Sequence, residues 1–193
     1  ASLFASAEVG YQNYLYLTLT GRNDWDSSLK GPYSSKKSFF YPSVGLSALL
    51  SEVIQMPSWF TYLKGRVSYT SVGKSYEPYL TNNFNYYDPQ TRTYEKSTTE
   101  AYQNLKPEIT DSYEFGLNMR FLDGKINLDA TYYISDTRNQ TFDIMQSSTS
   151  GYKYKRIQSG NVRNSGLELS LRYSNKWGDF SWNSDYTFSY NKN

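Results

Sequence analysis

Two runs of alternating apolar and polar residues meet at an Asp-Gly pair in residues 110–136, which read TDSYEFGLNMRFLDGKINLDATYYISD. Asp123 and Gly124 both tolerate the positive φ of a tight hairpin turn, so we expect the chain to fold back there. The fold-back sets largely apolar pairs on one face: Phe121 with Ile126, Met119 with Leu128, Leu117 with Ala130, Phe115 with Tyr132, and Tyr113 with Ile134. It sets more polar pairs on the other: Arg120 with Asn127, Asn118 with Asp129, Gly116 with Thr131, and Glu114 with Tyr133. Because a slip of one residue would invert the faces of one strand, this turn predicts a hairpin with one apolar and one polar side.

The same alternation predicts eight strands, near residues 2–12, 14–22, 39–50, 60–72, 110–122, 125–136, 165–175 and 180–191. A three-residue turn at residues 12–14 sets Tyr11 beside Leu15 on the apolar face. Near the end of the chain, a turn at Trp177-Gly178 sets Tyr173 beside Trp182. A turn at Gly178-Asp179 keeps the same sidedness, so the faces of this last hairpin are predicted and its register is left open.

The connections between these strands alternate in length. Short links lie near 12–14, 122–125 and 175–179, a modest one lies at 51–59, and long ones lie at about 22–38, 73–109 and 137–164. Outer-membrane barrels have short periplasmic turns and long external loops. This pattern places Trp59, Phe60, Trp177 and Trp182 in an inner aromatic girdle and Phe39, Phe40 and Tyr41 in an outer one.

Composition narrows the function classes. Aromatic residues make up 18% of the chain at a mean hydropathy of −0.72, which argues against disorder because disordered chains are poor in aromatics. The longest apolar-looking segment, 44–54, is too short and too interrupted for a transmembrane helix. The chain has no Cys and no His, which excludes thiol chemistry and imidazole catalysis, and its net charge of +2 is spread without a nucleic-acid patch. No acid/base pair or phosphate loop can be assigned, so we expect no enzymatic activity, no cofactor and no metal site.

Charged residues fall consistently on the more polar face of the predicted strands. The set is Glu8, Lys64, Arg66, Glu114, Arg120, Asp129, Glu168, Arg172 and Asp185. A Lys or Arg facing lipid near the bilayer midplane costs about 2–4 kcal/mol, so these groups are expected to line water or to pair with one another. A polar wall of this kind is typical of a wide barrel that holds a channel or a plug.

Several strings then occur in the order found in one family. Residues 104–110 (NLKPEIT) followed by 113–117 (YEFGL), and residues 160–169 (GNVRNSGLEL), resemble stretches of the SusC/RagA-type TonB-dependent transporters. Residues 40–45 and 63–69 resemble barrel strands of that family, in the same order. The likeness covers residues 40–193 well and the first 39 more loosely. From the residues alone, Gly160 and Gly166 are interpreted as relieving crowding or permitting a bulge, and Asn161 and Asn164 as capping turns in a loop.

The resemblance implies that residues 1–193 form an all-β, antiparallel segment of about eight strands in a plugged barrel of about 22 strands. Members of that family import glycans or peptides across the outer membrane of Bacteroidetes-type bacteria. A SusD-like surface lipoprotein covers the barrel, and TonB supplies energy from the inner membrane. The chain shows no plug domain, no TonB-box region and no carboxy-terminal aromatic ending, so energy coupling is not expected within these residues.

Ligand contacts are expected in the long loops, where aromatic and polar residues occur together. The candidates are Trp25 in the first long loop and Tyr76, Tyr79, Phe84, Tyr86, Tyr87 and Asp88 in the second. Aromatic faces stack on sugar rings and peptide side chains, which favours an oligosaccharide or peptide ligand. The competing interpretation is that these residues pack the loop onto its neighbours or onto a lid protein.

Two other functions fit the alternating pattern. A complete eight-stranded outer-membrane barrel serving as anchor or adhesin requires the strand at 2–12 to pair with the strand at 180–191. A soluble β-sandwich that binds glycans through its tyrosines requires a second sheet packed over Leu15, Leu17 and Leu19.

Overall fold

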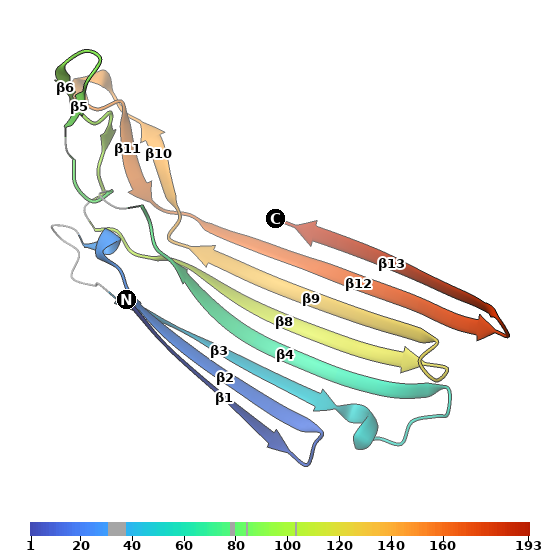
Figure 1. Ribbon diagram of the computed structural model, residues 1–193. Coiled ribbons are helices and arrows are strands. Elements are labelled where there is room, and N and C mark those ends of the chain that lie inside the picture. The colour runs from blue at the N-terminus through green and yellow to red at the C-terminus, as the bar shows by residue number, and fades with distance from the viewer. Residues whose placement is uncertain (31–37, 78–79, 84, 103) are drawn as a thin grey trace.

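The computed structural model describes residues 1–30, 38–77, 80–83, 85–102 and 104–193. Eight strands form one antiparallel sheet in the order β1-β2-β3-β4-β8-β9-β12-β13 (Figure 1). Their bounds are β1 Ser2–Tyr11, β2 Leu15–Trp25, β3 Ser38–Leu49, β4 Phe60–Lys74, β8 Glu108–Phe121, β9 Ile126–Arg138, β12 Asn161–Trp177 and β13 Phe180–Lys192. No helix among the described residues is long and apolar enough to cross a bilayer.

The central hairpin has the predicted register throughout. Phe121 lies opposite Ile126 and Tyr113 opposite Ile134, with every intervening pair as expected. The turn has one more left-handed residue than the Asp-Gly pair, because Leu122, Asp123 and Gly124 all have positive φ, at 53°, 57° and 82°. The first hairpin is also confirmed, with Tyr11 opposite Leu15.

The last hairpin turns at Gly178-Asp179 instead of Trp177-Gly178. Tyr173 therefore lies opposite Ser184, and Trp182 lies opposite Asn175. This turn has Gly178 at φ 60°, a conformation that a glycine adopts without a steric penalty, whereas Trp177 would be strained there. The register differs by two residues from the Trp177-Gly178 alternative, so the predicted faces are retained.

The two faces of the sheet are chemically distinct across its whole width. One continuous row of paired residues runs through all eight strands as Val9, Leu17, Leu46, Val67, Phe115, Tyr132, Leu167 and Tyr190. The next row along the strands lies on the opposite face and runs as Glu8, Thr18, Gly45, Ser68, Glu114, Tyr133, Gly166 and Asn191. We call these the apolar face and the polar face.

Ion pairs join several of the charged residues of the polar face. Arg66 on β4 donates through Nη1 and Nη2 to both carboxylate oxygens of Asp129 on β9, at 3.1 and 2.9 Å. Its guanidinium crosses β8 above Gly116, where a Cβ atom would lie 2.2 Å from Arg66 Nε. Arg172 donates to Asp185 at 2.6 Å. The predicted internal pairing of these charges is confirmed for both pairs.

Aromatic residues gather at the two ends of the strands. Trp59, Phe60 and Phe121 stack at the short-turn end, with the Phe60 and Phe121 ring centroids 4.8 Å apart. Phe39 and Tyr41 stack at the other end, with their centroids 5.7 Å apart. The predicted separation of these two groups is confirmed.

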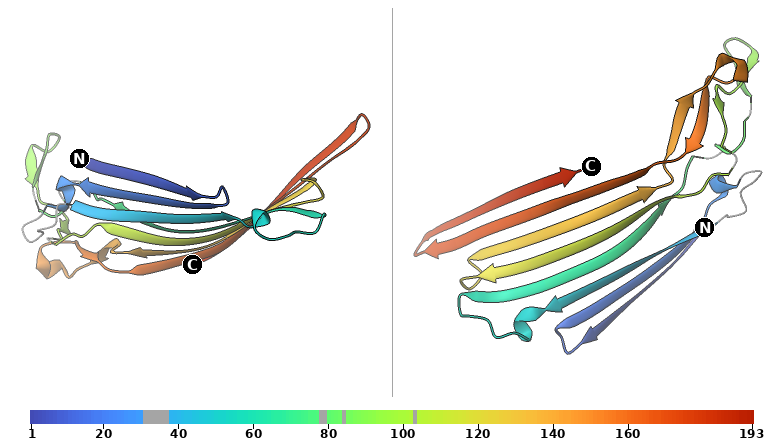
Figure 2. Two further views of the ribbon diagram at one scale, coloured as in Figure 1. Left: turned by 90° about the horizontal axis from the view of Figure 1, so that it is seen from below. Right: turned by 180° about the vertical axis from the view of Figure 1, so that it is seen from behind.

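The arrangement is neither a sandwich nor a closed barrel of eight strands. Leu19 is 40% exposed, and no second sheet covers the apolar face over the described residues. β1 and β13 lie at opposite edges of a curved, twisted sheet and do not pair with each other in the described part of the chain (Figure 2). The sheet is therefore an arc of a larger wall.

Candidate ligand-binding arm

An arm of additional strands rises from the end of the sheet opposite the short turns (Figure 1). It contains β5 Tyr86–Asp88 paired with β6 Thr93–Glu95, and a second small sheet in the order β10-β11-β7, with β10 Thr141–Met145, β11 Tyr154–Gln158 and β7 Thr99–Glu100. The sequence predicts long loops at 73–109 and 137–164, and these short strands within them were not predicted. Asn161 and Asn164 likewise lie in β12 and not in a loop.

The arm is built jointly from the connection between β4 and β8 and the connection between β9 and β12. β7 from the β4–β8 connection pairs in parallel with β11 from the β9–β12 connection. The backbone N–H groups of Lys153 and Tyr154 both donate to the Thr98 carbonyl, at 2.9 and 3.0 Å. Lys96 Nζ lies 4.0 Å from the centre of the Tyr152 ring. The two connections therefore form one interleaved unit.

The base of the arm contains the most buried side chains among the described residues. Leu29 is 1% exposed, Leu105 2% and Thr81 2%. Thr81 Oγ1 donates to the Lys30 carbonyl at 2.9 Å, and the Ser28 and Ser75 hydroxyls are 2.7 Å apart. The segment that follows β2 thus packs at this base against Ser75 and Thr81 of the connection between β4 and β8. Burial is concentrated here because the sheet itself is a single layer.

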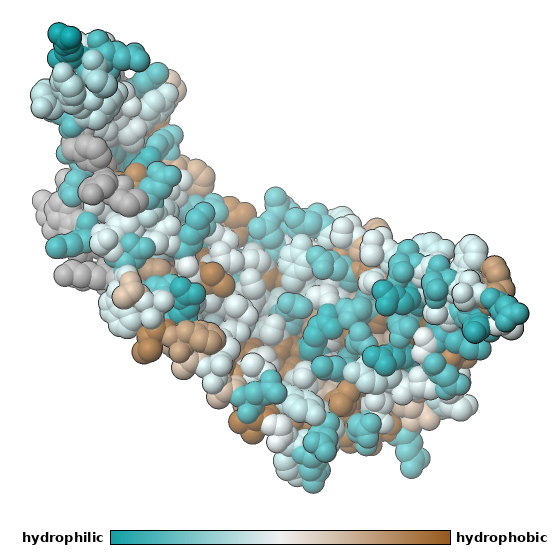
Figure 3. Space-filling model, viewed as in Figure 1, coloured by the Kyte–Doolittle hydropathy of each residue, from teal (hydrophilic) through white to brown (hydrophobic). Residues whose placement is uncertain are grey.

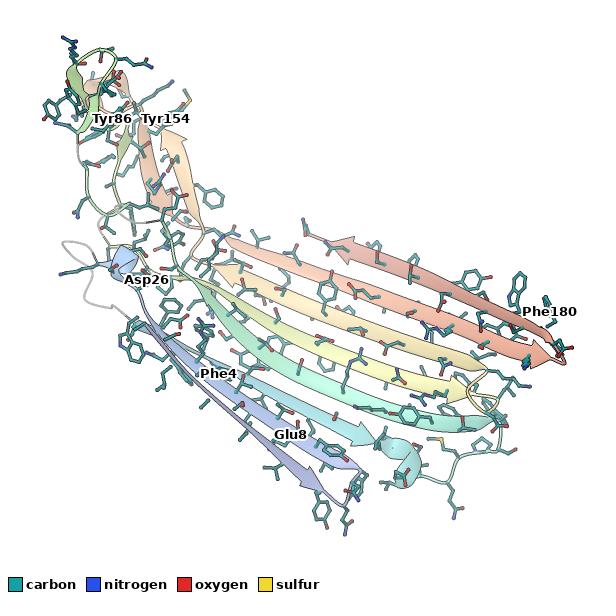
Figure 4. The ribbon with its side chains drawn as sticks, viewed as in Figure 1. Phe4, Glu8, Asp26, Tyr86, Tyr154 and Phe180 are labelled. Atoms are coloured by element: carbon teal, nitrogen blue, oxygen red, sulfur yellow. The ribbon has the colours of Figure 1, made fainter. Side chains whose placement is uncertain are left out.

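The exposed tip of the arm presents tyrosines. Tyr87 on β5 and Tyr94 on β6 are paired in register, with ring centroids 5.3 Å apart and exposures of 51% and 76%. The Tyr86 hydroxyl donates to Glu95 Oε2 at 2.7 Å, which raises the pKa of that phenol. The surface around the tip is largely hydrophilic (Figure 3), and Tyr86 projects there in Figure 4. The tip therefore presents exposed aromatic faces within a hydrophilic surface.

The other predicted contact residues have different positions. The Asp88 carboxylate accepts from the Gln90 N–H at 2.8 Å and shapes the β5–β6 turn, which lowers its pKa. Trp25 is 47% exposed at the end of β2, away from the tip. Tyr79 and Phe84 lie outside the described residues.

Tyr76 lies at the base of the arm instead of its tip. Its hydroxyl donates to the Asn139 carbonyl and accepts from Gln158 Nε2 at 3.1 Å. Burial raises the pKa of this phenol. Because both hydrogen bonds are made within the chain, the packing interpretation applies to Tyr76.

The acidic residues beside Trp25 are engaged in the fold. Asp26 lies at the arm base (Figure 4) and caps a short 3₁₀ turn, Ser27–Leu29, by accepting from the Ser28 N–H at 2.8 Å. Hydrogen bonds from Ser75 and Ser28 lower the pKa of Asp26. Asp24 accepts from Arg22 at 2.8 Å and also from Tyr41. Over the described residues no cluster of Asp, Glu, His or Cys is arranged to hold a metal ion.

Gln158 is the residue of this region that the sequence did not single out. Its side-chain amide contacts three segments of the arm base, but an isolated glutamine in a polar stretch carries no pattern that distinguishes it from a solvent-exposed one. For the neighbouring Gly160, the crowding interpretation applies, since a Cβ there would lie 2.9 Å from the Phe142 ring. Gly166 fits the same interpretation, since a Cβ there would lie 2.6 Å from the Tyr133 ring.

The sheet is open and antiparallel, with one apolar face and one polar face that carries ion pairs. Short turns lie at one end of its strands and the arm at the other. These features define a wall of a membrane β-barrel. All of residues 1–193 match the family model described as "TonB dependent receptor-like, beta-barrel". The chain belongs to this family of TonB-dependent receptors and forms part of the barrel.

Curated relatives agree with this assignment. The chain is 28% identical over 202 residues to TonB-dependent receptor P26 of Formosa agariphila and 26% identical over 201 residues to TonB-dependent receptor P3 of the same organism. Each alignment covers 100% of this chain and 20% of the relative. The chain thus spans about a fifth of the length of these relatives.

Solved structures share the fold. A chain of the RagAB peptide importer in its open-open state superposes with a TM-score of 0.84 at 24% identity, covering 99% of this chain and 21% of that one. The siderophore receptor PirA from Pseudomonas aeruginosa superposes with a TM-score of 0.64 at 16% identity, covering 98% of this chain and 34% of that one. Both likenesses concern the fold alone.

Proposed function

We propose that the chain is a wall segment of an outer-membrane importer that takes up oligosaccharides or peptides with energy supplied through TonB. The observation that supports this most directly is the pair of rows across the sheet, one apolar or aromatic in all eight strands and the other polar in most of them. Such a sheet is stable only between hydrocarbon and water, and both of its edges need further strands to close a barrel of about 22. The plug and the TonB contact would lie in parts of the full-length receptor beyond this segment.

In the proposed orientation the arm is extracellular and the short turns are periplasmic. Trp59, Phe60, Trp177 and Trp182 then mark the inner interface, and Phe39, Phe40 and Tyr41 mark the outer one. A SusD-like lipoprotein would cover the same end of the barrel as the arm. The arm is proposed to bind and orient ligand without catalysing a reaction on it.

The proposed ligand contacts are Tyr87 and Tyr94, because they are exposed aromatic faces on a short, hydrogen-bonded hairpin. The RagAB assembly, whose fold the chain shares, is described as a peptide importer, so a peptide is the first ligand to test. Oligosaccharides remain the second, since a tyrosine face also stacks on a sugar ring.

Site-specific labelling of intact cells tests the orientation. The segment itself contains no Cys, so single cysteines introduced at Thr91, in the β5–β6 turn, and at Asp179, in the last short turn, are distinguishable. In the full-length receptor, a membrane-impermeant maleimide should label Thr91→Cys in intact cells and Asp179→Cys only after the outer membrane is opened. Labelling of Asp179→Cys in intact cells with Thr91→Cys protected would reverse the proposed topology.

A further inference from the structure

One continuous hairpin runs from the wall, where β9 pairs with β12, into the arm, where β10 pairs with β11. Its two strands bend at the same place. Arg138 of β9 lies opposite Asn161 of β12, and Thr141 of β10 lies opposite Gln158 of β11, so Asn139 is opposite Gly160 in an unbroken register. Both of these residues have positive φ, at 63° for Asn139 and 105° for Gly160. Two left-handed residues facing each other redirect both strands together, because each one turns its own backbone out of the line of the sheet.

The side-chain amide of Gln158 lies on this bend and binds a segment that belongs to the other connection. Its Oε1 accepts from the Lys106 N–H at 2.9 Å, and its Nε2 donates to the Lys106 carbonyl at 2.6 Å. The amide therefore occupies both backbone hydrogen-bonding groups of Lys106, as a neighbouring strand would. Lys106 immediately precedes Pro107, which leads into β8 of the wall.

The same nitrogen also closes the bend. Nε2 of Gln158 lies within hydrogen-bonding distance of the Asn139 carbonyl, at 2.9 Å, and of the Tyr76 hydroxyl, at 3.1 Å. Asn139 in turn donates through Nδ2 to the Pro107 carbonyl at 3.1 Å. One side chain thus connects the bend, the entry to β8 and Tyr76, the second residue after β4.

We infer that Gln158 is a positioning residue, whose amide fixes the direction in which the arm leaves the barrel wall and hence the place of the Tyr87–Tyr94 pair. The part of this inference that concerns ligand rests on the proposed function. Left-handed residues permit a bend but do not select its direction, since φ can vary within the allowed region. The hydrogen bonds of Gln158 supply the selection, because they are satisfied together in one arrangement.

Distance measurements in the full-length receptor test this inference. Spin labels at Met145→Cys, which is 77% exposed on the arm, and at Asp123→Cys, in the β8–β9 turn at the far end of the sheet, report the arm direction. The receptor with Gln158 intact should give one narrow distance distribution. Gln158→Glu keeps an acceptor for Lys106 but turns an oxygen toward the carbonyls of Lys106 and Asn139. Gln158→Met keeps the length and removes every hydrogen bond. Both variants should broaden or shift the distribution.

A control and a second readout separate positioning from general stability. Gln12→Glu makes the same chemical change in an exposed short turn and should leave the distribution unchanged. The unfolding temperature of the barrel should stay the same in all three variants, because the affected bonds lie outside the eight-stranded sheet. An unchanged distance distribution in Gln158→Met would overturn the inference. A broadened distribution that comes with a lower unfolding temperature of the barrel would overturn it as well.

Ligand binding is measured separately on the same proteins. In the variants whose distance distribution broadens, the affinity for a peptide ligand should fall about tenfold. This loss is expected when two or three hydrogen bonds no longer hold the binding conformation. The distance distribution could broaden in the Gln158 variants while the affinity stays unchanged in them and in Tyr94→Ala. In that case the proposed contact site is wrong and the positioning role of Gln158 stands.

Discussion

Arg66 and Asp129 are joined by two hydrogen bonds although a whole strand, β8, lies between their own strands β4 and β9. The guanidinium reaches across because position 116 is a glycine, and Nη2 adds a bond to Thr131 at 2.6 Å. Asn118 also donates to Asp129, at 2.9 Å. The four side chains form a clamp over three strands on the polar face.

Removal of this clamp is expected to lower barrel stability measurably. Asp129→Asn should reduce the free energy of unfolding by about 1–2 kcal/mol, because the Arg66 charge loses a bidentate partner. The clamp side chains of Arg66 and Asp129 are 35% and 34% exposed, so this figure lies below the cost of breaking a fully buried pair. Denaturant titration of the receptor refolded into lipid vesicles measures the change.

Asp185→Asn is the matched control on the same face. Its pair with Arg172 is 56% and 65% exposed, and an ion pair as open to solvent as this contributes about 0–1 kcal/mol. Equal losses for the two variants would contradict the clamp as a distinct contribution to stability.

Exposed aromatic faces at the arm tip predict a selective loss of binding. Tyr94→Ala should weaken ligand affinity several-fold, as expected from about 0.5–1.5 kcal/mol for one aromatic contact. Tyr94→Phe should retain most of the affinity, since the ring face is kept. Calorimetric titration with a peptide measures both, and comparable losses for the two variants would show that the hydroxyl, not the ring, makes the contact.

Gly160 and Gly124 have different surroundings and should differ in how well they tolerate substitution by alanine. Gly160→Ala combines a left-handed φ with a Cβ 2.9 Å from the Phe142 ring, so we expect a loss of about 1–3 kcal/mol in the local stability of the arm base. Gly124→Ala has φ 82° with nothing within 4 Å of the new Cβ, so only the backbone cost of about 1 kcal/mol applies. Amide hydrogen exchange around each position measures the two losses, and the reverse order would count against the crowding at Gly160.

The arm should lose order in acid. Arg156 donates twice to Asp143, at 2.8 Å each, and holds the pKa of that carboxyl below its ordinary value. A carboxyl with a lowered folded-state pKa contributes stability that is present above the unfolded value of about 3.9 and is lost as the pH falls through the folded value. Protection of the β10 and β11 amides should therefore be constant from pH 7 to 5 and decline below about pH 4.

Asp143→Asn provides the comparison for this pH dependence. The variant should show lower protection at neutral pH and a weaker decline in acid, because the ionised partner of Arg156 is already missing. A decline of the same size in the variant would assign the acid sensitivity to another group.

Sequence alone was sufficient for the wall because alternation and turn chemistry act locally. The pairing of Phe121 with Ile126 follows from an Asp-Gly turn, and the sidedness of each strand follows from its two-residue period. The last hairpin shows the limit, since Gly178 can lie in either of two turns that place the same residues on the same faces.

The arm could not be predicted in this way because its contacts are between distant segments. β7 has two residues and no alternation of its own, and it exists because β11, more than fifty residues later, presents a free edge. Tyr76 and Tyr87 both belong to one tyrosine-rich connection, yet one lies at the packed base and the other at the exposed tip. Composition identified the region as rich in tyrosine. Whether each tyrosine is packed or exposed depends on the side chains that the β9–β12 connection brings to it.

The interleaving of β7 with β11 limits how this receptor can be diversified. Because each of the two connections completes the backbone hydrogen bonding of the other, replacing either one alone with a counterpart of different length or backbone course would leave Thr98 and Lys153 without their partners. Chimaeras that alter ligand preference should therefore exchange residues 75–107 and 139–160 together. Among natural relatives, sequence changes in one segment should occur together with changes in the other.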